Sequence, residues 1–180
     1  MTLPARSNRG ADGLKVLSVA SPNSPLRLDS GRTLDEVDIA YETWGELSPK
    51  RDNVVIVCHA LTGDQFAGSP NPITSRPAWW PLIVGPGLPI DTNRFYVICT
   101  NILGGCMGST GPASQKPDGS GVWGTDFPLI TIADMVRAQI ALLDQLGIEQ
   151  VFLAIGGSLG GMQVLEWTIQ ARNRVFAAVP

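Results

Sequence analysis

The sequence has little from which a metal site or a disulfide framework could be built. Its 180 residues include one histidine, His59, and three cysteines, with no C-x-x-C pair. Structural zinc sites need four Cys or His ligands, so we expect no bound metal. An odd number of scattered cysteines also favours a reducing compartment over a secreted, disulfide-bonded protein.

Charge and long apolar runs are scarce as well. Only 16% of the residues are charged, the net charge is −3, and no basic cluster occurs. We therefore expect no nucleic-acid partner and no anionic membrane surface as partner. No apolar run approaches the roughly 18 residues that span a bilayer, and the first residues contain no apolar core of a secretory signal. Together these absences predict a cytoplasmic protein.

The remaining pattern predicts an α/β domain with a mostly parallel sheet and antiparallel N-terminal strands. Residues 1–24 are polar and are expected to form a poorly ordered N-terminus, so the domain is assigned to residues 25–180. Apolar or alternating runs predict strands at 25–30, 37–44, 54–58, 95–99, 151–155 and 175–179.

Helices are predicted between the later strands. Thr131 and Asp134 have the spacing of a capping box, and Gly147 is a typical helix stop. The apolar face between them is expected to comprise Ile132, Met135, Val136, Ile140, Leu143 and Leu146. A second helix is predicted from Met162 to Gln170. The long connections 59–94 and 100–130 follow buried strands, which is where α/β sheets place their ligands.

One motif carries specific chemistry. Gly156-Gly157-Ser158-Leu159-Gly160 lies between a buried strand and a helix, which is the context of a nucleophile elbow. Such a sharp turn holds its serine in a strained conformation with the hydroxyl exposed, and flanking side chains would clash. The alternative is a glycine-rich turn that only packs tightly. A dinucleotide-binding loop would need Gly at position 158, and a P-loop would need a Gly-Lys-Ser/Thr triplet that the chain lacks.

Acyl transfer through a serine requires an oxyanion hole. One backbone N–H is expected from Leu159, directly after Ser158, and the second from the loop after strand 54–58. In that loop Leu61 is the first candidate and Thr62 the next, while an ordinary strand-end turn is the alternative. Thr62 and Gly63 are also the candidate substrate-binding residues.

Other reactive side chains are weaker candidates. His59 could act as general base, but in this architecture the base follows the serine in chain order, so a structural or loop-orienting role is favoured. Cys106 lies in a glycine-rich stretch with no base nearby in sequence. Trp79 and Trp80 are expected to pack the loop rather than bind a ligand.

Several segments together resemble the homoserine O-acetyltransferases, within the homoserine O-acyltransferases of the α/β-hydrolase superfamily. The resemblance runs from about residue 25 to the C-terminus. It rests on residues 59–64, on Trp79-Trp80 with residues 85–87 and 90–92, on residues 101–112, on residues 127–139 and on residues 156–163. The family usually has Met where this chain has Leu159, a mild departure because only the backbone N–H is needed.

The resemblance implies an α/β-hydrolase fold, here truncated after about the sixth strand, with the lid and C-terminal strands absent. The family's catalytic Asp and His, and an Arg for the substrate carboxylate, would then lie beyond Pro180, and the 180-residue chain alone is expected to be inactive. The implied reaction moves an acetyl group from acetyl-CoA to L-homoserine in methionine biosynthesis, by a ping-pong acyl-serine mechanism. Acyl-CoA would be a co-substrate, with no bound cofactor, and the full-length protein a homodimer. Succinyl-CoA as donor, or a serine hydrolase or esterase of the same fold, are the alternatives.

Overall fold

The computed structural model describes residues 8–9 and 14–180, which form two compact units. One contains the described residues up to Ala40 together with Asn101–Gly147, and the other contains Tyr41–Thr100 and Ile148–Pro180. Each unit is therefore built from two separate stretches of the chain. Strand β5 (Val37–Trp44) carries it from the first unit into the second.

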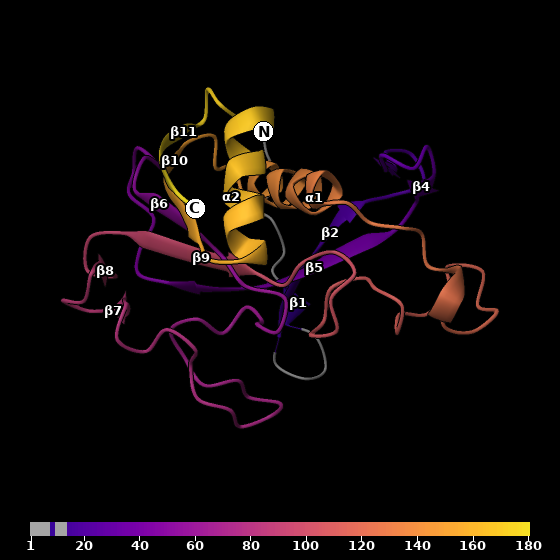
Figure 1. Cartoon of the computed structure of the whole chain (residues 1–180), viewed down its shortest axis with the longest axis horizontal. Helices are drawn as coiled ribbons and strands as arrows, with labels where there is room; N and C mark the ends of the chain where they lie inside the picture. Colours follow the sequence, from indigo (N-terminus) through magenta and orange to yellow (C-terminus); the bar gives the residue numbers. More distant parts are fainter. Residues whose placement is uncertain (1–7, 10–13) are drawn as a thin grey trace. The chain divides into compact units, whose positions relative to one another are not determined.

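In the first unit, antiparallel strand pairs accompany one long helix (Figure 1). β1 (Asn8–Arg9) pairs with β2 (Lys15–Ala20), and β3 (Leu26–Arg27) pairs with β4 (Thr33–Leu34) across a turn in which Gly31 has a φ of +82°. A 3₁₀ helix spans Gly124–Asp126, and α1 (Ile132–Gln145) packs on β2.

Two predictions for this unit need correction. The sequence predicts a poorly ordered N-terminus over residues 1–24, yet residues 15–20 form β2, because Leu17, Val19 and Ala20 are buried in the unit. The part of that prediction on residues 1–7 and 10–13 lies outside the described residues. The buried face of α1 is also rotated: it includes Asp134, Ala138, Gln139 and Leu142 beside Val136 and Leu143, whereas Ile132, Met135, Ile140 and Leu146 are half-buried.

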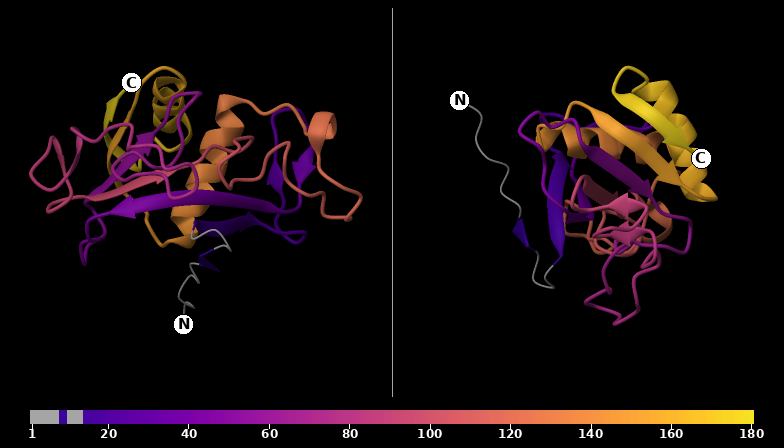
Figure 2. Two further views of the ribbon diagram at one scale, coloured as in Figure 1. Left: turned by 90° about the horizontal axis from the view of Figure 1, so that it is seen from below. Right: turned by 90° about the vertical axis from the view of Figure 1, so that its left-hand side faces the viewer.

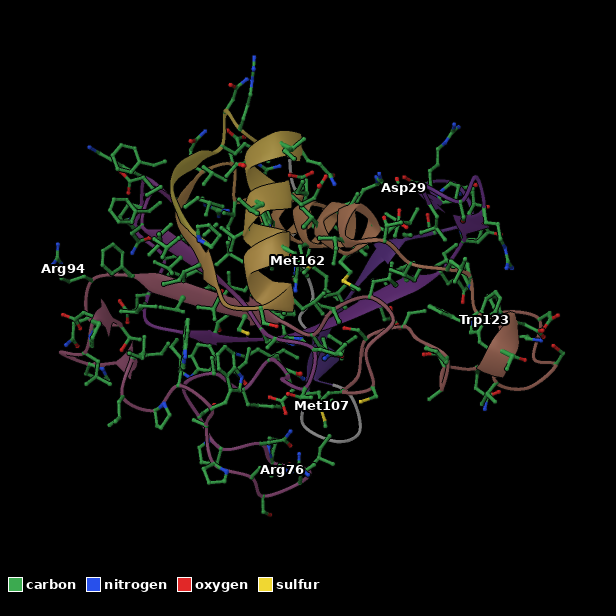
Figure 3. The ribbon with its side chains drawn as sticks, viewed as in Figure 1. Asp29, Arg76, Arg94, Met107, Trp123 and Met162 are labelled. Atoms are coloured by element: carbon green, nitrogen blue, oxygen red, sulfur yellow. The ribbon has the colours of Figure 1, made fainter. Side chains whose placement is uncertain are left out.

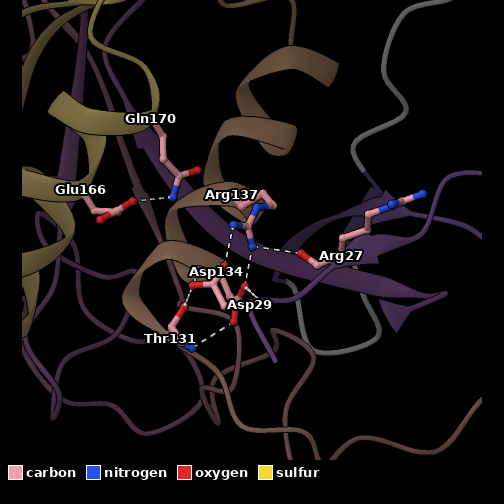
Figure 4. A network of polar contacts seen from close by, with 7 residues as sticks. All are labelled: Arg27, Asp29, Thr131, Asp134, Arg137, Glu166 and Gln170. Carbon is pink, nitrogen blue, oxygen red and sulfur yellow. Dashed lines mark hydrogen bonds and ion pairs between the residues drawn. The ribbon is translucent and has the colours of Figure 1, made fainter. Parts of the chain in front are cut away.

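The buried carboxylate on α1 is held by a polar network (Figure 4). Asp134 accepts hydrogen bonds from the backbone N–H groups of Asp29 and Thr131, each at 3.0 Å, and pairs with Arg137. With the Thr131 side chain accepting from the Asp134 N–H at 3.2 Å, the predicted capping box is confirmed. Arg137 also pairs with Asp29 at 2.9 Å and donates to the Arg27 carbonyl, so the network ties α1 to the β3 segment.

The second unit contains the parallel strands. In the order β5–β9–β6–β10–β11, β5 pairs antiparallel with β9 and the other four strands are parallel. Their bounds are β6 Val54–Cys58, β9 Tyr96–Thr100, β10 Val151–Gly156 and β11 Val175–Val179, and a short parallel pair joins β7 (Val84–Gly85) to β8 (Ile90–Asp91). The predicted fold class, a mostly parallel sheet with antiparallel N-terminal strands, is confirmed.

Helix α2 (Leu159–Gln170) packs against β6, β10 and β11 of this unit, and the right-hand view of Figure 2 shows it beside the C-terminal strands. It buries Val164 and Trp167 completely. A hydrophobic cluster joins β6 and β9 to the connection between them, and its seven buried members are Val55, Val57, Ala67, Val84, Ile90, Val97 and Cys99. The strand order reverses at β6, since the chain places β9 on one side and later β10 on the other, and ligands of open α/β sheets bind at such reversals.

Candidate active site

Ser158 occupies the turn between β10 and α2, as the motif predicts. Its backbone has φ 58° and ψ −125°, a region that side-chain-bearing residues rarely adopt. Strain of this kind costs about 1–3 kcal/mol and persists only where the surroundings enforce it. The residue is exposed, and its hydroxyl caps no helix N–H. The turn therefore presents an accessible serine oxygen.

Two glycines of the motif allow α2 to approach β6. A Cβ at Gly156 would lie 2.9 Å from the Cβ of Cys58, and a Cβ at Gly160 would lie 2.8 Å from the Cys58 carbonyl carbon and overlap its oxygen. Gly157, in contrast, has open space where a Cβ would stand. The predicted clash thus holds for the first and last glycines of the motif.

The loop after β6 begins at the strand end beside this turn. The register pairs Cys58 at the end of β6 with Gly156 at the end of β10. A tight turn follows, in which the Gly63 N–H donates to the Ala60 carbonyl at 2.9 Å and Leu61 and Thr62 are exposed. The Gly63 amide is therefore used within the loop.

Two backbone N–H groups remain available at these strand ends. Within residues 8–9 and 14–180, neither the Leu61 N–H nor the Leu159 N–H hydrogen-bonds to another group. Leu159 is also the first residue of α2, where the helix dipole favours negative charge. One of these donors directly follows Ser158, and the other lies in the loop that leaves β6 where Cys58 pairs with Gly156, so both are candidates for the oxyanion hole that acyl transfer requires.

The single histidine is buried rather than presented to the serine. His59 is 1% exposed, and its Nδ1 lies 2.7 Å from the Ala60 carbonyl oxygen. Burial lowers its pKa, against the opposing effects of the Ala60 hydrogen bond and the nearby Asp64 charge. The carbonyl of His59 accepts a hydrogen bond from Gln163 at 3.2 Å. These contacts favour the predicted structural or loop-orienting role over general-base catalysis.

The rest of the 59–94 connection is tied together by polar contacts. Asp64 accepts hydrogen bonds from the Phe66 N–H at 2.9 Å and from the Asn71 side chain at 2.7 Å. The Trp79 indole donates to the Asp64 carbonyl at 3.0 Å, and its ring packs against the core cluster with that of Trp80. The two tryptophans thus pack the loop, and the side chain of Arg76 lies farther out along it (Figure 3).

The cysteines are divided between buried and exposed positions. Burial raises the pKa of the Cys58 thiol to about 12 and that of Cys99 well above its usual value, so both remain protonated and unreactive. Cys106 is exposed, in the unit that holds residues 101–147. There the Asn101 side chain organises its loop by accepting from the Met107 N–H at 3.1 Å.

Among residues 8–9 and 14–180, no three His, Cys, Asp or Glu side chains gather where they could hold a metal ion. Over the same residues, no helix combines the length and apolarity needed to cross a bilayer.

Comparison with known proteins identifies the family. Residues 53–179, which include both the loop after β6 and the serine turn, match the family described as alpha/beta hydrolase fold. This chain belongs to the α/β hydrolase fold family. The resemblance named from the sequence motifs therefore implied the correct fold.

Curated relatives of this α/β hydrolase chain are considerably longer. A homoserine O-acetyltransferase of Nitrobacter hamburgensis is 55% identical over 158 residues, covering 88% of this chain and 40% of the relative. One of Acidiphilium cryptum is 54% identical over 162 residues, covering 89% and 42%. The chain spans about two fifths of the length of the curated relatives it matches.

Solved structures of two activities resemble the chain. Homoserine O-acetyltransferase from Bacillus anthracis superposes with a TM-score of 0.83 at 29% identity, covering 92% of this chain and 45% of that one. An acetylester hydrolase from Corynebacterium glutamicum superposes with a TM-score of 0.77 at 26% identity, covering 100% and 47%.

Sequence reasoning on this α/β hydrolase chain missed one residue that bears on the site. Gln163 is fully buried and donates to both the His59 carbonyl and, at 3.3 Å, the Leu159 carbonyl. A glutamine on the buried side of α2, four residues after Leu159, was the available signal, because a buried amide must find partners.

Proposed function

We propose that this chain carries the nucleophile and oxyanion donors of a homoserine O-acyltransferase that uses acetyl-CoA. The observation that carries the proposal is Ser158, held in a strained and exposed turn. The unpaired N–H of Leu159 follows it directly, and that of Leu61 belongs to the loop that leaves β6 where Cys58 pairs with Gly156. Curated relatives 53–55% identical to the chain bear the name homoserine O-acetyltransferase, which supports the choice of acceptor.

In this mechanism the Ser158 oxygen attacks the thioester carbonyl carbon of acetyl-CoA and loses its proton to a base. The Leu61 and Leu159 N–H groups stabilise the oxyanion, the carbon–sulfur bond breaks, and coenzyme A leaves with a proton. The homoserine hydroxyl then attacks the acetyl-serine, which yields O-acetylhomoserine and regenerates Ser158. Acetyl-CoA is thus a co-substrate, and the proposal includes no bound cofactor.

The proposal leaves the general base unassigned among these residues. His59 is the only histidine of the sequence and is buried against its own loop. We place the base, its partner carboxylate and the substrate-binding arginine in the longer polypeptide that the relatives possess. For that polypeptide we propose a cytoplasmic homodimer acting in methionine biosynthesis, with Thr62 and Gly63 near the substrate.

A hydrolase is the second candidate, and the acetylester hydrolase structure favours it specifically. In a hydrolase, water would replace homoserine as acceptor on the same acyl-serine. Succinyl-CoA in place of acetyl-CoA would leave the chemistry at Ser158 unchanged.

The deciding experiment measures coenzyme A release by the product of the complete reading frame. The assay runs with acetyl-CoA or succinyl-CoA, each with and without L-homoserine, and Ser158→Ala is the control. We expect release from acetyl-CoA that depends on both homoserine and Ser158. Release that homoserine leaves unchanged would overturn the transferase and support the hydrolase.

A further inference from the structure

The direction of the Leu61 N–H is fixed by whatever holds the preceding carbonyl. The Ala60 C=O and the Leu61 N–H belong to one peptide unit, which is planar and trans, so the two groups point in opposite directions. A rotation of this unit that released the Ala60 carbonyl would carry the Leu61 N–H away with it. The orientation of the Leu61 N–H therefore depends on the hydrogen bonds that hold the Ala60 carbonyl.

Two donors hold that carbonyl. The Gly63 N–H donates to the Ala60 oxygen at 2.9 Å, and the Nδ1 of His59 lies 2.7 Å from the same atom. A carbonyl oxygen only accepts hydrogen bonds, so the His59 proton must be on Nδ1. Both lone pairs of the Ala60 oxygen are thereby used, one by the turn itself and one by a side chain.

The His59 residue is in turn held from α2. Its carbonyl accepts a hydrogen bond from Gln163 Nε2 at 3.2 Å, and the same amide group lies 3.3 Å from the Leu159 carbonyl. His59 and Gln163 are both almost fully buried, 1% and 0% exposed. The Gln163 amide thus links His59, at the start of the loop that contains Leu61, to Leu159.

The second donor needs no such side chain. The peptide that contains the Leu159 N–H has the Ser158 carbonyl on its other side, and that carbonyl accepts from the Met162 N–H at 3.1 Å as part of the first turn of α2. A helix therefore aims the Leu159 donor. In the loop after β6 no helix exists to do the same for Leu61.

We propose that His59 is a positioning residue that aims the Leu61 N–H at the oxyanion by holding the Ala60 carbonyl through Nδ1–H, and that Gln163 keeps His59 in place. The inference rests on the proposed acyl transfer at Ser158. It assigns to the only histidine a role that requires a hydrogen-bond donor at one ring position and no proton transfer.

Two substitutions at position 59 separate this role from that of a base. The side-chain NH₂ of asparagine stands near the Nδ1 position of histidine, so His59→Asn keeps a donor for the Ala60 carbonyl, whereas His59→Leu removes it. We expect His59→Leu to lower kcat roughly a hundredfold with KM changed little, because losing an oxyanion donor costs about 10²–10³ in kcat. His59→Asn is expected to stay within about tenfold of the unsubstituted enzyme.

The assays use the complete reading-frame product and two reactions. Coenzyme A release with homoserine follows the proposed function, and hydrolysis of p-nitrophenyl acetate follows acyl-serine chemistry without it. If homoserine has no effect but the ester assay gives the same order of variants, the proposed function fails while the positioning role stands. If both variants lose activity equally, by the more than roughly 10⁴-fold that loss of a base causes, His59 is the base and the positioning role is wrong.

Matched glutamines on α2 test the second half of the proposal. Gln163→Leu is expected to lower kcat roughly tenfold or more in the ester assay, within the limit set by complete loss of one donor. Gln170→Leu serves as control, since Gln170 is exposed and its side chain bonds to Glu166. Equal activities of the two variants would overturn the role of Gln163.

A measurement independent of activity covers variants that fold poorly. In the 180-residue chain labelled with ¹⁵N, imidazole spectra are expected to show a neutral His59 ring with its proton on Nδ1 at neutral pH. A proton on Nε2 would overturn the proposal, because Nδ1 could then not donate to Ala60.

Discussion

The close approach of α2 to β6 predicts opposite effects of the same substitution at two neighbouring glycines. In Gly160→Ala the new methyl group would lie 2.8 Å from the Cys58 carbonyl carbon and 3.2 Å from the His59 oxygen, and both are backbone atoms that cannot rotate aside. In Gly157→Ala it would meet nothing within 4 Å. Gly157→Ala is therefore a control that makes the same substitution within the same motif.

The expected magnitudes follow from this geometry. Overpacking costs about 1–3 kcal/mol, and we expect Gly160→Ala to lower the free energy of unfolding by about 2 kcal/mol. For a chain of this size that loss corresponds to a Tm decrease of roughly 4–8 °C. Gly157 does not have a positive φ, so Gly157→Ala should raise the free energy of unfolding by about 0.4–1 kcal/mol through the unfolded state.

Urea unfolding followed by circular dichroism, on both variants and the unsubstituted 180-residue chain, measures these differences. The prediction is a lower midpoint for Gly160→Ala and an equal or higher one for Gly157→Ala. Equal midpoints for the two variants would refute the reasoning, because the backbone of β6 would then yield to the extra methyl group.

Three further predictions concern strain, protonation and buried charge. Ser158→Gly should raise the free energy of unfolding by about 1 kcal/mol by relieving the positive φ, whereas Ser158→Ala should not. Equal stabilisation by the two substitutions would contradict the strain at this position. Mass spectrometry should find no acyl-enzyme in either variant. Burial lowers the pKa of His59, so its ring stays neutral in the folded state while the unfolded state binds a proton below about pH 6.5. The free energy of unfolding should therefore fall with decreasing pH, by at most about 1.4 kcal/mol per pH unit. Urea titrations of the unsubstituted chain and His59→Asn test this, and identical slopes would disprove it. Arg137→Met removes the cation beside the fully buried Asp134 carboxylate and should lower the free energy of unfolding by about 2–3 kcal/mol. Lys116→Met breaks a pair with an exposed carboxylate and should lower it by less than about 1 kcal/mol. Equal losses in urea unfolding would argue against a special role for the buried carboxylate.

Strands with a continuous apolar sequence were predictable. Val54–Cys58 forms a fully buried strand with the predicted bounds, because a strand in the middle of a parallel sheet needs apolar side chains on both faces. Val175–Val179 also forms a strand with the predicted bounds, although it is the last strand in the order and Phe176 and Val179 are exposed. β2 was missed although most of its residues are apolar, because the segments around it are polar and its burial depends on α1, more than a hundred residues later in the chain. Local pattern carries no information about such a partner.

The candidate site likewise has features that the sequence predicts and features that depend on distant residues. The strained backbone of Ser158 follows from its motif, because the glycines at 156 and 160 are needed for the approach to β6. The bridge from Gln163 to the His59 carbonyl could not be predicted, since 104 residues separate the two partners. Which ring atom of His59 bonds to Ala60 likewise depends on how the loop closes in three dimensions.

The pairing of β6 with β10 has a consequence for the order in which the chain is made. Val55 lies opposite Leu153, so β6 leaves the ribosome roughly a hundred residues before its neighbour, or about 5–20 s earlier at usual rates of synthesis. During that time β9 can pair with one side of β6, while the other side, with its apolar surface, has no strand to cover it. Nascent chains that end before β10 should therefore be the form of this protein that chaperones bind and that aggregates, and slower translation of residues 101–150 would prolong that exposure.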